Sequence, residues 1–280
     1  MAHTTNPPTL NLIGAGRVAQ TLASLWHQHS SFLVQDILTT SLHSAHAACS
    51  VMGTGQAVAQ IQAMRGADVW MLAVPDAQLA ACAQALAAAH TVTADLNTPI
   101  VFHCSGAQSA ATLAPLAALG WHVASAHCIL SFASVAGAIA QFPGTPCALE
   151  GDAVACAALR IAFTTIGARC FSVASGDKLL YHAAAVFATN FLPALQATAE
   201  QLWQATGVPN DVIVDLRAAL LRNAVANITT LGPQAALTGP AARGDTAAIA
   251  RQGAAVAAWD AQAGAAYEAM SALALRLAQQ

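Results

Sequence analysis

The chain has 280 residues, of which 56% are hydrophobic and only 8% are charged, and its formal net charge is −3. This charge balance excludes nucleic acid as a partner, and no apolar run is long enough to cross a membrane. A charged fraction far below the usual ~25% implies a wide apolar surface, so we expect a homodimer that covers it.

The N-terminal part alternates short apolar runs with helical patterns, which is typical of a parallel sheet wrapped by helices. Residues 1–8 have neither the basic start nor the apolar core of a signal peptide, so we expect a cytoplasmic protein. The scattered cysteines, without a C-x-x-C pair, predict buried thiols and no metal site. The predicted strands span residues 10–13, 32–38, 68–74, 100–103, 123–126, 147–150 and 170–173, and the predicted helices span residues 17–27, a segment from about 108, and residues 153–166.

The C-terminal part carries helical patterns only. Pro193 removes a hydrogen bond from the first of them and predicts a kink beside Asn190. The predicted helices span residues 178–206, residues 211–231, and a last segment that Asp245 caps and that runs toward Leu277.

These patterns place the chain in the α/β class, as a Rossmann-type doubly wound parallel sheet followed by an all-helical second domain. We assign residues 1–174 to a dinucleotide-binding domain. Residues 175–280 form a helical domain that binds substrate and mediates dimerisation through the C-terminal helices.

The segment Gly14-Ala15-Gly16-Arg17-Val18-Ala19 follows an apolar strand and opens an amphipathic helix, which is the context of a dinucleotide-binding turn. Gly14 permits the tight turn, Gly16 lets the backbone approach a pyrophosphate, and the small Ala19 lets the helix pack closely on the strand. The N–H groups at the helix start would bind the phosphates. The motif predicts NAD(P) as the cofactor, in contact with residues 14–18.

Selection of NAD usually needs an acidic residue at the tip of the second strand, where it binds the ribose 2′-hydroxyl. Here Asp36 lies inside the strand, and the tip carries Thr39, Thr40 and Ser41. These hydroxyls accommodate a 2′-phosphate, although no arginine is present to bind it. We therefore predict NADP, with NAD as the alternative, and place Thr40 and Ser41 at the ribose.

Ligands of open α/β sheets bind at the carboxyl ends of the strands, and three segments lie there. Val74-Pro75-Asp76 should line the nicotinamide. In the next segment, Ser105 either caps the following turn or, together with Gly106, presents N–H groups to a substrate carboxylate. His103 and His127, each at the end of a strand, are candidate substrate-binding residues, and a purely structural role is the alternative for His127.

Lys178, His182 and Asn190 are spaced by multiples of four along one helix, which keeps them near one face among apolar residues. Hydride transfer to a carbonyl or imine needs a proton donor, which His182 or Lys178 can supply, and Asn190 would orient the substrate or the acid. The alternative is that Lys178 reaches solvent and His182 is a core residue. Arg243, in a glycine-rich loop, either binds an anionic substrate or caps a helix end.

Together these segments resemble a family of uncharacterised bacterial oxidoreductase-like proteins, the domain-of-unknown-function 2520 group. The resemblance implies a Rossmann domain, a helical dimerisation domain and a site in the cleft between them. It rests on segments that follow one another through nearly the whole chain, namely Gly14 to Ala19, Ala73 to Asp76, His103 to Gly106, Ser125 to His127, Tyr181 to Asn190 and Leu237 to Asp245.

The wider relatives that this resemblance implies are pyrroline-carboxylate reductases, β-hydroxyacid dehydrogenases and deazaflavin-dependent NADP oxidoreductases. The β-hydroxyacid enzymes have a serine-containing substrate loop and a lysine–asparagine helix, which Ser105 and the helix from Lys178 to Asn190 resemble in place but not in spacing. Thr40 also stands where an arginine is expected for NADP in this group.

The sequence thus predicts an NAD(P)-dependent oxidoreductase that transfers a hydride between nicotinamide and a small anionic metabolite held near Ser105. An imine reductase of the pyrroline-carboxylate type is the alternative within the same class. A protein that senses NAD(P) without catalysis is the alternative from another class.

Overall fold

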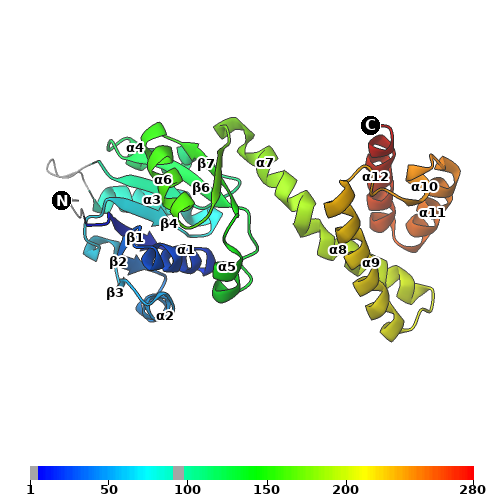
Figure 1. Ribbon diagram of the computed structural model, residues 1–280, viewed down its shortest axis with the longest axis horizontal. Coiled ribbons are helices and arrows are strands. Elements are labelled where there is room, and N and C mark those ends of the chain that lie inside the picture. The colour runs from blue at the N-terminus through cyan, green and yellow to red at the C-terminus, as the bar shows by residue number, and fades with distance from the viewer. Residues whose placement is uncertain (1–5, 91–97) are drawn as a thin grey trace. The chain divides into compact units, whose positions relative to one another are not determined.

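The computed structural model describes residues 6–90 and 98–280 and divides into two compact units, residues 1–186 and residues 187–280. The first unit holds every strand of the described chain, and the second is helical (Figure 1). The sequence places the domain boundary at 174/175, after the last strand, whereas the compact units divide one helix later. No helix in the described ranges combines the length and the hydropathy that a membrane span requires.

A sheet of eight strands forms the first unit, in the order β3-β2-β1-β4-β5-β6-β7-β8. Each predicted strand is present, and the short β3 is an addition. The pairs are parallel except β6–β7, which is antiparallel, so the predicted parallel sheet holds only as far as β6. The strands are β1 (Thr9–Ile13), β2 (Leu33–Leu38), β3 (Gln56–Val58), β4 (Val69–Leu72), β5 (Ile100–His103), β6 (His122–Cys128), β7 (Pro146–Gly151) and β8 (Arg169–Ser172).

Helices cover both faces of this sheet. Successive side chains of a strand point to opposite faces, so a strand of apolar residues gives the sheet two apolar faces to bury. Val69 and Met71 of β4 belong to one apolar cluster, with residues of α1 and α6, whereas Trp70 and Leu72 belong to a second cluster, with residues of α3 and α4. The helices of this unit are α1 (Arg17–Gln28), α2 (Leu42–Met52), α3 (Leu79–Ala89), α4 (Ala114–Ala117), α5 (Val135–Gln141), α6 (Ala153–Thr165) and α7 (Lys178–Ala185).

Trp26 anchors α1 in the first cluster. Its ring makes edge-on contacts with Phe32, Phe102 and Phe163, and its indole N–H donates to the Ala162 carbonyl at 3.0 Å. Fully buried aromatic rings of this kind bury more apolar area than any other side chain, and the satisfied N–H removes the cost of burying a donor. The N-terminus of α1 is thereby held at the carboxyl edge of the sheet.

The second unit begins within one turn of π-helix at Val186–Asn190, which lies where Pro193 predicts a kink. The predicted single helix from Asp245 toward Leu277 is wrong, because the segment forms two helices. Asp260 adopts an extended conformation between them, and its carboxylate caps the second helix by accepting from Ala263 N at 2.7 Å. The helices are α8 (Phe191–Ala205), α9 (Asn210–Leu231), α10 (Gly239–Ala242), α11 (Thr246–Trp259), which Asp245 caps as predicted, and α12 (Ala261–Ala278).

Candidate functional site

A pocket of about 910 Å³ lies at the carboxyl ends of β1, β2 and β4. Its volume falls in the ~300–1,000 Å³ range of small-molecule sites. None of the residues that line it is charged. They are the turn residues Gly14, Ala15 and Gly16 with Ile13 and Gln20, the segment Leu38, Thr39, Thr40 and Ser44, the α2 residues Ala47, Ala48 and Val51, and the segment Ala73, Val74, Pro75, Gln78, Ala81 and Cys82.

The two glycines of the turn differ in what surrounds them. Gly14 has φ +86°, and a Cβ there would lie 2.5 Å from the Ala73 carbonyl oxygen, so only glycine fits against β4. Gly16 is the N-cap of α1, makes no side-chain cap, and has no atom within 4 Å of where a Cβ would be. The space beside Gly16 and the N–H groups of the first turn of α1 therefore fit a phosphate, as a dinucleotide requires.

Three other predicted turn residues have distinct roles. The Arg17 guanidinium donates to the Phe132 and Ala133 carbonyls at 3.2 and 2.8 Å, so it holds the loop after β6 beside the turn. Val18 packs against the core, and Ala19 is fully buried. Only residues 14–16 of the motif line the pocket, so contacts of Arg17 and Val18 with a cofactor stay a prediction.

Hydroxyl groups gather where β2 ends and α2 begins. Ser44 Oγ lies 2.6 Å from Thr39 Oγ1 and 2.9 Å from Ser41 Oγ, and Ser41 caps α2 by accepting from Ser44 N at 3.1 Å. Thr40 lies in the pocket wall beside them. The tip of β2 thus offers hydroxyls and a helix start, both of which favour an anion.

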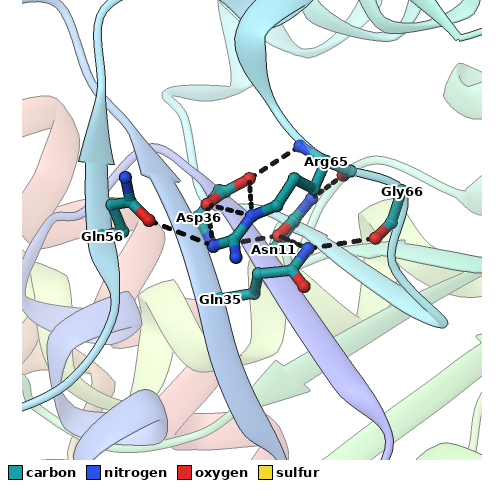
Figure 2. A network of polar contacts seen from close by, with 6 residues as sticks. All are labelled: Asn11, Gln35, Asp36, Gln56, Arg65 and Gly66. Carbon is teal, nitrogen blue, oxygen red and sulfur yellow. Dashed lines mark hydrogen bonds and ion pairs between the residues drawn. The ribbon is translucent and has the colours of Figure 1, made fainter.

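Asp36 points toward Arg65, as Figure 2 shows. Its carboxylate is 1% exposed and binds the Arg65 guanidinium and the Arg65 backbone N–H, the latter at 2.7 Å. Asn11 Oδ1 accepts from Asp36 N at 3.0 Å, in a β-bulge where two residues of β2 face one residue of β1. Asp36 is therefore a structural acid inside the sheet, as its position in the strand predicts.

Lys178 lies at the start of α7 and is 1% exposed, which excludes the alternative that it reaches solvent. Its Nζ donates to the Ser105 carbonyl at 2.9 Å and to Ser125 Oγ at 3.0 Å. Ser125 Oγ in turn lies 3.0 Å from Glu150 Oε2. We call Ser105, Ser125, Glu150 and Lys178 the Lys178 cluster.

The Ser105 hydroxyl connects this cluster to the pocket. It donates to Asp76 Oδ2 at 2.7 Å, and Asp76 directly follows Pro75 of the pocket wall. It also accepts from the N–H groups of Ala107 and Gln108 at 3.2 and 3.0 Å. Ser105 thus caps the turn after β5, which is the first of the two roles that the sequence allows.

His103 is fully buried, and its ring is engaged on both sides. Ser105 N donates to His103 Nδ1 at 3.2 Å, so Nδ1 is an acceptor and the proton lies on Nε2, which donates to the Ser109 carbonyl at 3.1 Å. Burial lowers the pKa of His103 further below neutrality. Both nitrogens therefore shape the loop, and the predicted contact of His103 with a substrate has no geometric support in this structure.

Gly106, His127, Tyr181 and His182 form a second group next to the cluster. His127 Nδ1 lies 2.9 Å from the Tyr181 hydroxyl, and its ring stands edge-on to His182, with centroids 5.8 Å apart. Burial lowers the pKa of His127 to about 4 and raises that of Tyr181 to about 12. His182 Nδ1 is buried without a hydrogen-bond partner among the described residues, so it is free to accept from or donate to a bound molecule.

Asn190 and Arg243 belong to the second unit. Asn190 Oδ1 accepts from Thr189 Oγ1 at 2.9 Å, at the end of the π-turn, and Arg243 follows α10. Their participation in the site stays a prediction. In the described ranges, no three His, Cys, Asp or Glu side chains are placed to hold a metal ion.

Sequence reasoning missed three polar residues of this region, namely Ser125, Glu150 and Tyr181. Glu150 had a usable signal, because it directly follows the uncharged run 146–149. A carboxylate at the end of a predicted buried strand is unusual in a chain with 8% charged residues. Ser125 and Tyr181 lie in segments that carry the family resemblance, but a serine in a strand and a tyrosine in a helix have no assigned role until their partners are known.

Two domain families match the chain. The Rossmann-like domain matches residues 6–128, and the domain of unknown function DUF2520 matches residues 145–274. The two matches follow one another along the chain in the order that the sequence predicts. No curated protein matches it by sequence.

Solved structures share the fold over nearly the whole chain. Protein TM1727 from Thermotoga maritima is 23% identical, with TM-score 0.75 and coverage of 96% of this chain and 98% of that chain. An imine reductase from Myxococcus stipitatus in complex with NADP+ is 18% identical, with TM-score 0.63 and coverage of 97% and 94%. The 1-pyrroline-5-carboxylate reductase from Streptococcus pyogenes is 14% identical, with TM-score 0.61 and coverage of 97% and 100%. At these identities the likeness shows the fold, and it confirms the predicted fold class.

Proposed function

We propose that this chain, which joins a Rossmann-like domain to a DUF2520 domain, is an NAD(P)-dependent oxidoreductase that acts on a small anionic metabolite. One observation carries the proposal: the glycine turn that fits a phosphate and the buried Lys178 cluster lie at one edge of one sheet, joined through Pro75, Asp76 and Ser105. A nicotinamide dinucleotide, when bound, supplies or accepts the hydride. The chain's own residues bind it, exclude water and hold the proton that the substrate needs.

Lys178 is the residue to which we assign that proton. Its ammonium has three N–H groups, of which two bond to Ser105 and Ser125, so one remains for a substrate oxygen or nitrogen. Burial lowers its pKa, which brings an amine toward the range useful for proton transfer. His182 would orient the substrate beside it.

NADP is the cofactor that the pocket favours. No carboxylate lines the tip of β2, because Asp36 is bound to Arg65, so a ribose diol has no acidic partner there. The hydroxyls of Thr39, Ser41 and Ser44 at the start of α2 suit a 2′-phosphate. NAD stays the alternative, since no arginine lines the pocket.

An imine reductase is a second candidate within the same chemistry. Two of the structures that share the fold are an imine reductase and a pyrroline-carboxylate reductase. Hydride transfer to a C=N carbon needs one proton on nitrogen, and Lys178 would serve either acceptor. Assays with cyclic imines and with 2-oxo acids distinguish the two.

We also propose that two copies associate through the C-terminal helices. In residues 187–280, Ile213 and Ala241 are the only buried hydrophobic side chains, so this unit has almost no core of its own. A second copy would cover the exposed apolar side chains, which include Leu192, Leu195, Val214, Leu220, Val225, Ile228 and Leu231. Ile228→Glu should shift the sedimentation coefficient toward the monomer, whereas Ile161→Glu on α6, an equally apolar and more exposed side chain, should leave it unchanged.

Calorimetric titration with NADPH and NADH tests the cofactor. Micromolar binding of one nucleotide that a Gly16→Val variant loses supports the proposal. Binding of neither to folded protein would overturn it. Binding without turnover on any oxo acid or imine would favour the NAD(P)-sensing alternative.

Turnover of variants tests the acid. Lys178→Gln should lower it by about 10²-fold or more while nucleotide affinity changes less than a few-fold, the range expected for lost acid–base catalysis. His182→Ala should raise KM for the substrate as well as lower turnover. If His182→Ala costs as much turnover as Lys178→Gln with an unchanged KM, the proton donor is His182 instead.

A further inference from the structure

Lys178 is the only lysine in the sequence, and it is one of the most deeply buried side chains of the protein. A lysine ammonium is costly to bury unless it is bonded and balanced by an opposite charge. Glu150 is also buried, at 5% exposed, although only 8% of the chain is charged. Burial of these two charges costs free energy of folding, and packing alone does not explain why the protein bears that cost.

We infer that Glu150 is a positioning residue that acts through the Ser125 hydroxyl to fix the Lys178 ammonium against the Ser105 loop. The inference rests on the role proposed for Lys178 and adds the two residues behind it. Neither Glu150 nor Ser125 faces the dinucleotide pocket.

The directions of the hydrogen bonds support this role, because a lysine ammonium can only donate. Ser125 Oγ therefore accepts from Lys178, and its single hydroxyl proton is left for Glu150 Oε2, at 3.0 Å. The chain Lys178–Ser125–Glu150 is thus ordered from cation to carboxylate.

The Glu150 carboxylate is itself held rigidly. Its Oε2 also accepts from Ala110 N at 2.8 Å, and its Oε1 accepts from the Ser175 hydroxyl. Ser175 lies three residues before Lys178, so one carboxylate fixes both the entry to α7 and, through Ser125, the tip of its first side chain. Charge-assisted bonds of this kind are stronger than neutral ones.

The charges around Lys178 have opposing effects. Burial lowers its pKa most, and the carboxylates of Glu150 and Asp76 raise it, Glu150 more than Asp76. Loss of Glu150 therefore removes the largest influence that keeps the ammonium protonated. The other titratable groups that face Lys178 are His103 at the end of β5, His127 on β6, the thiols of Cys104 and Cys147, and Tyr181 on its own helix.

Nuclear magnetic resonance tests the inference directly, because a protein labelled with ζ-¹⁵N-lysine gives one side-chain signal. Titration of that signal needs neither cofactor nor substrate. We expect Glu150→Gln to lower the Lys178 pKa by about one unit, a tenfold change in acid dissociation, and Ser125→Ala to lower it by a smaller amount in the same direction. In a profile of turnover against pH, the fall of activity on the alkaline side should move to lower pH by the same amount.

Ser175→Ala is the matched control. It also removes a serine hydroxyl from Glu150, but from the oxygen that does not face Ser125, so the Lys178 titration should shift by less than the Ser125→Ala titration. Circular dichroism confirms that each variant is folded. If Glu150→Gln does not fold, Ser125→Ala, the smaller change, decides.

The inference is overturned if folded Ser125→Ala and Glu150→Gln variants titrate like the parent, or if Ser175→Ala shifts the signal as much as Ser125→Ala. Failure of the proposed function has a different signature. In that case the Lys178 signal responds to Glu150 and Ser125 as expected, while neither nucleotide binds.

Discussion

Gly106 lies directly against the His182 ring: a Cβ on Gly106 would be 2.5 Å from His182 Nδ1 and 2.9 Å from His127 Nε2. Both rings are ends of side chains and can rotate away, so Gly106→Ala should displace them without unfolding the protein. We expect turnover to fall by about tenfold or more, since displacements near 1 Å carry costs of that order or larger. Nucleotide affinity should stay within a few-fold. Gly176→Ala, which has open space, is the control, and full turnover of Gly106→Ala would contradict the role given to His182.

The two glycines of the nucleotide turn should fail in different ways. Gly14→Ala places a Cβ 2.5 Å from the Ala73 carbonyl at φ +86°, so it should lower the melting temperature by several degrees. A Cβ on Gly16 meets no atom of the protein, so Gly16→Val should leave the melting temperature nearly unchanged, yet block the phosphate site. Thermal melts and nucleotide titrations of both variants measure this. Equal effects of the two on melting would mean that Gly16 is only a structural glycine.

Thr40→Arg should strengthen NADPH binding. Thr40 lies in the pocket wall beside the hydroxyls of β2 and α2, where no cation lines the pocket. An added guanidinium that pairs with a 2′-phosphate should improve the dissociation constant by about tenfold, roughly 1.4 kcal/mol, and leave NADH binding unchanged. Isothermal titration at low and high salt checks it. A gain for NADH equal to that for NADPH would place the 2′-position elsewhere.

Asp36→Asn should destabilise the protein without altering its choice of nucleotide. The substitution removes the charge that binds Arg65 while Asn11 keeps its bond to the backbone N–H of residue 36. We expect the free energy of unfolding to fall by about 2 kcal/mol, because Arg65 is 55% exposed and can turn to water. Urea denaturation gives this value. A change in the ratio of NADPH to NADH affinity would show that Asp36 reaches the ribose after all.

His127 should make the fold sensitive to mild acid. Burial lowers its pKa to about 4, below the ~6.5 of an unfolded histidine, so the unfolded chain binds this proton more tightly. The free energy of unfolding should therefore fall as pH is lowered from about 6.5 toward 4, by about 2 kcal/mol from this group. His127→Gln should flatten that dependence in urea titrations at several pH values. His46→Gln, at an exposed histidine of α2, should not.

The fold was largely predictable, because strands and helices leave periodic patterns in apolar side chains. Strand β5 is predicted to the residue, and α9 to within one residue at its start. The last helical segment was not, since alanine continues on both sides of Asp260 and the break depends on one aspartate that caps the next helix. The reversal of β7 also leaves no local pattern, because strand direction is set by contacts between distant segments.

The site was predictable in its motifs and less so in its partners. The glycine turn and the tip of β2 follow from positions along the chain, and Lys178 was named from its helix. The sequence could not indicate that Lys178 is buried and bonds to Ser125, which in turn bonds to Glu150. These hydrogen bonds join three elements of the first unit that lie far apart along the chain. His103 illustrates the converse, since only the structure shows that both of its nitrogens are occupied.

The reversed strand β7 has a consequence for the direction of helix α7. Strand β7 is antiparallel to β6, and β8 is parallel to β7. The chain therefore leaves the end of β8 at the level of Ser125, midway along β6. Helix α7 then advances in the direction of β6, with Lys178 at Ser125 and Tyr181 at His127. The reversal of one strand thus sends the following helix back along β6, and it places Lys178 and Tyr181, in chain order, beside successive residues of that strand.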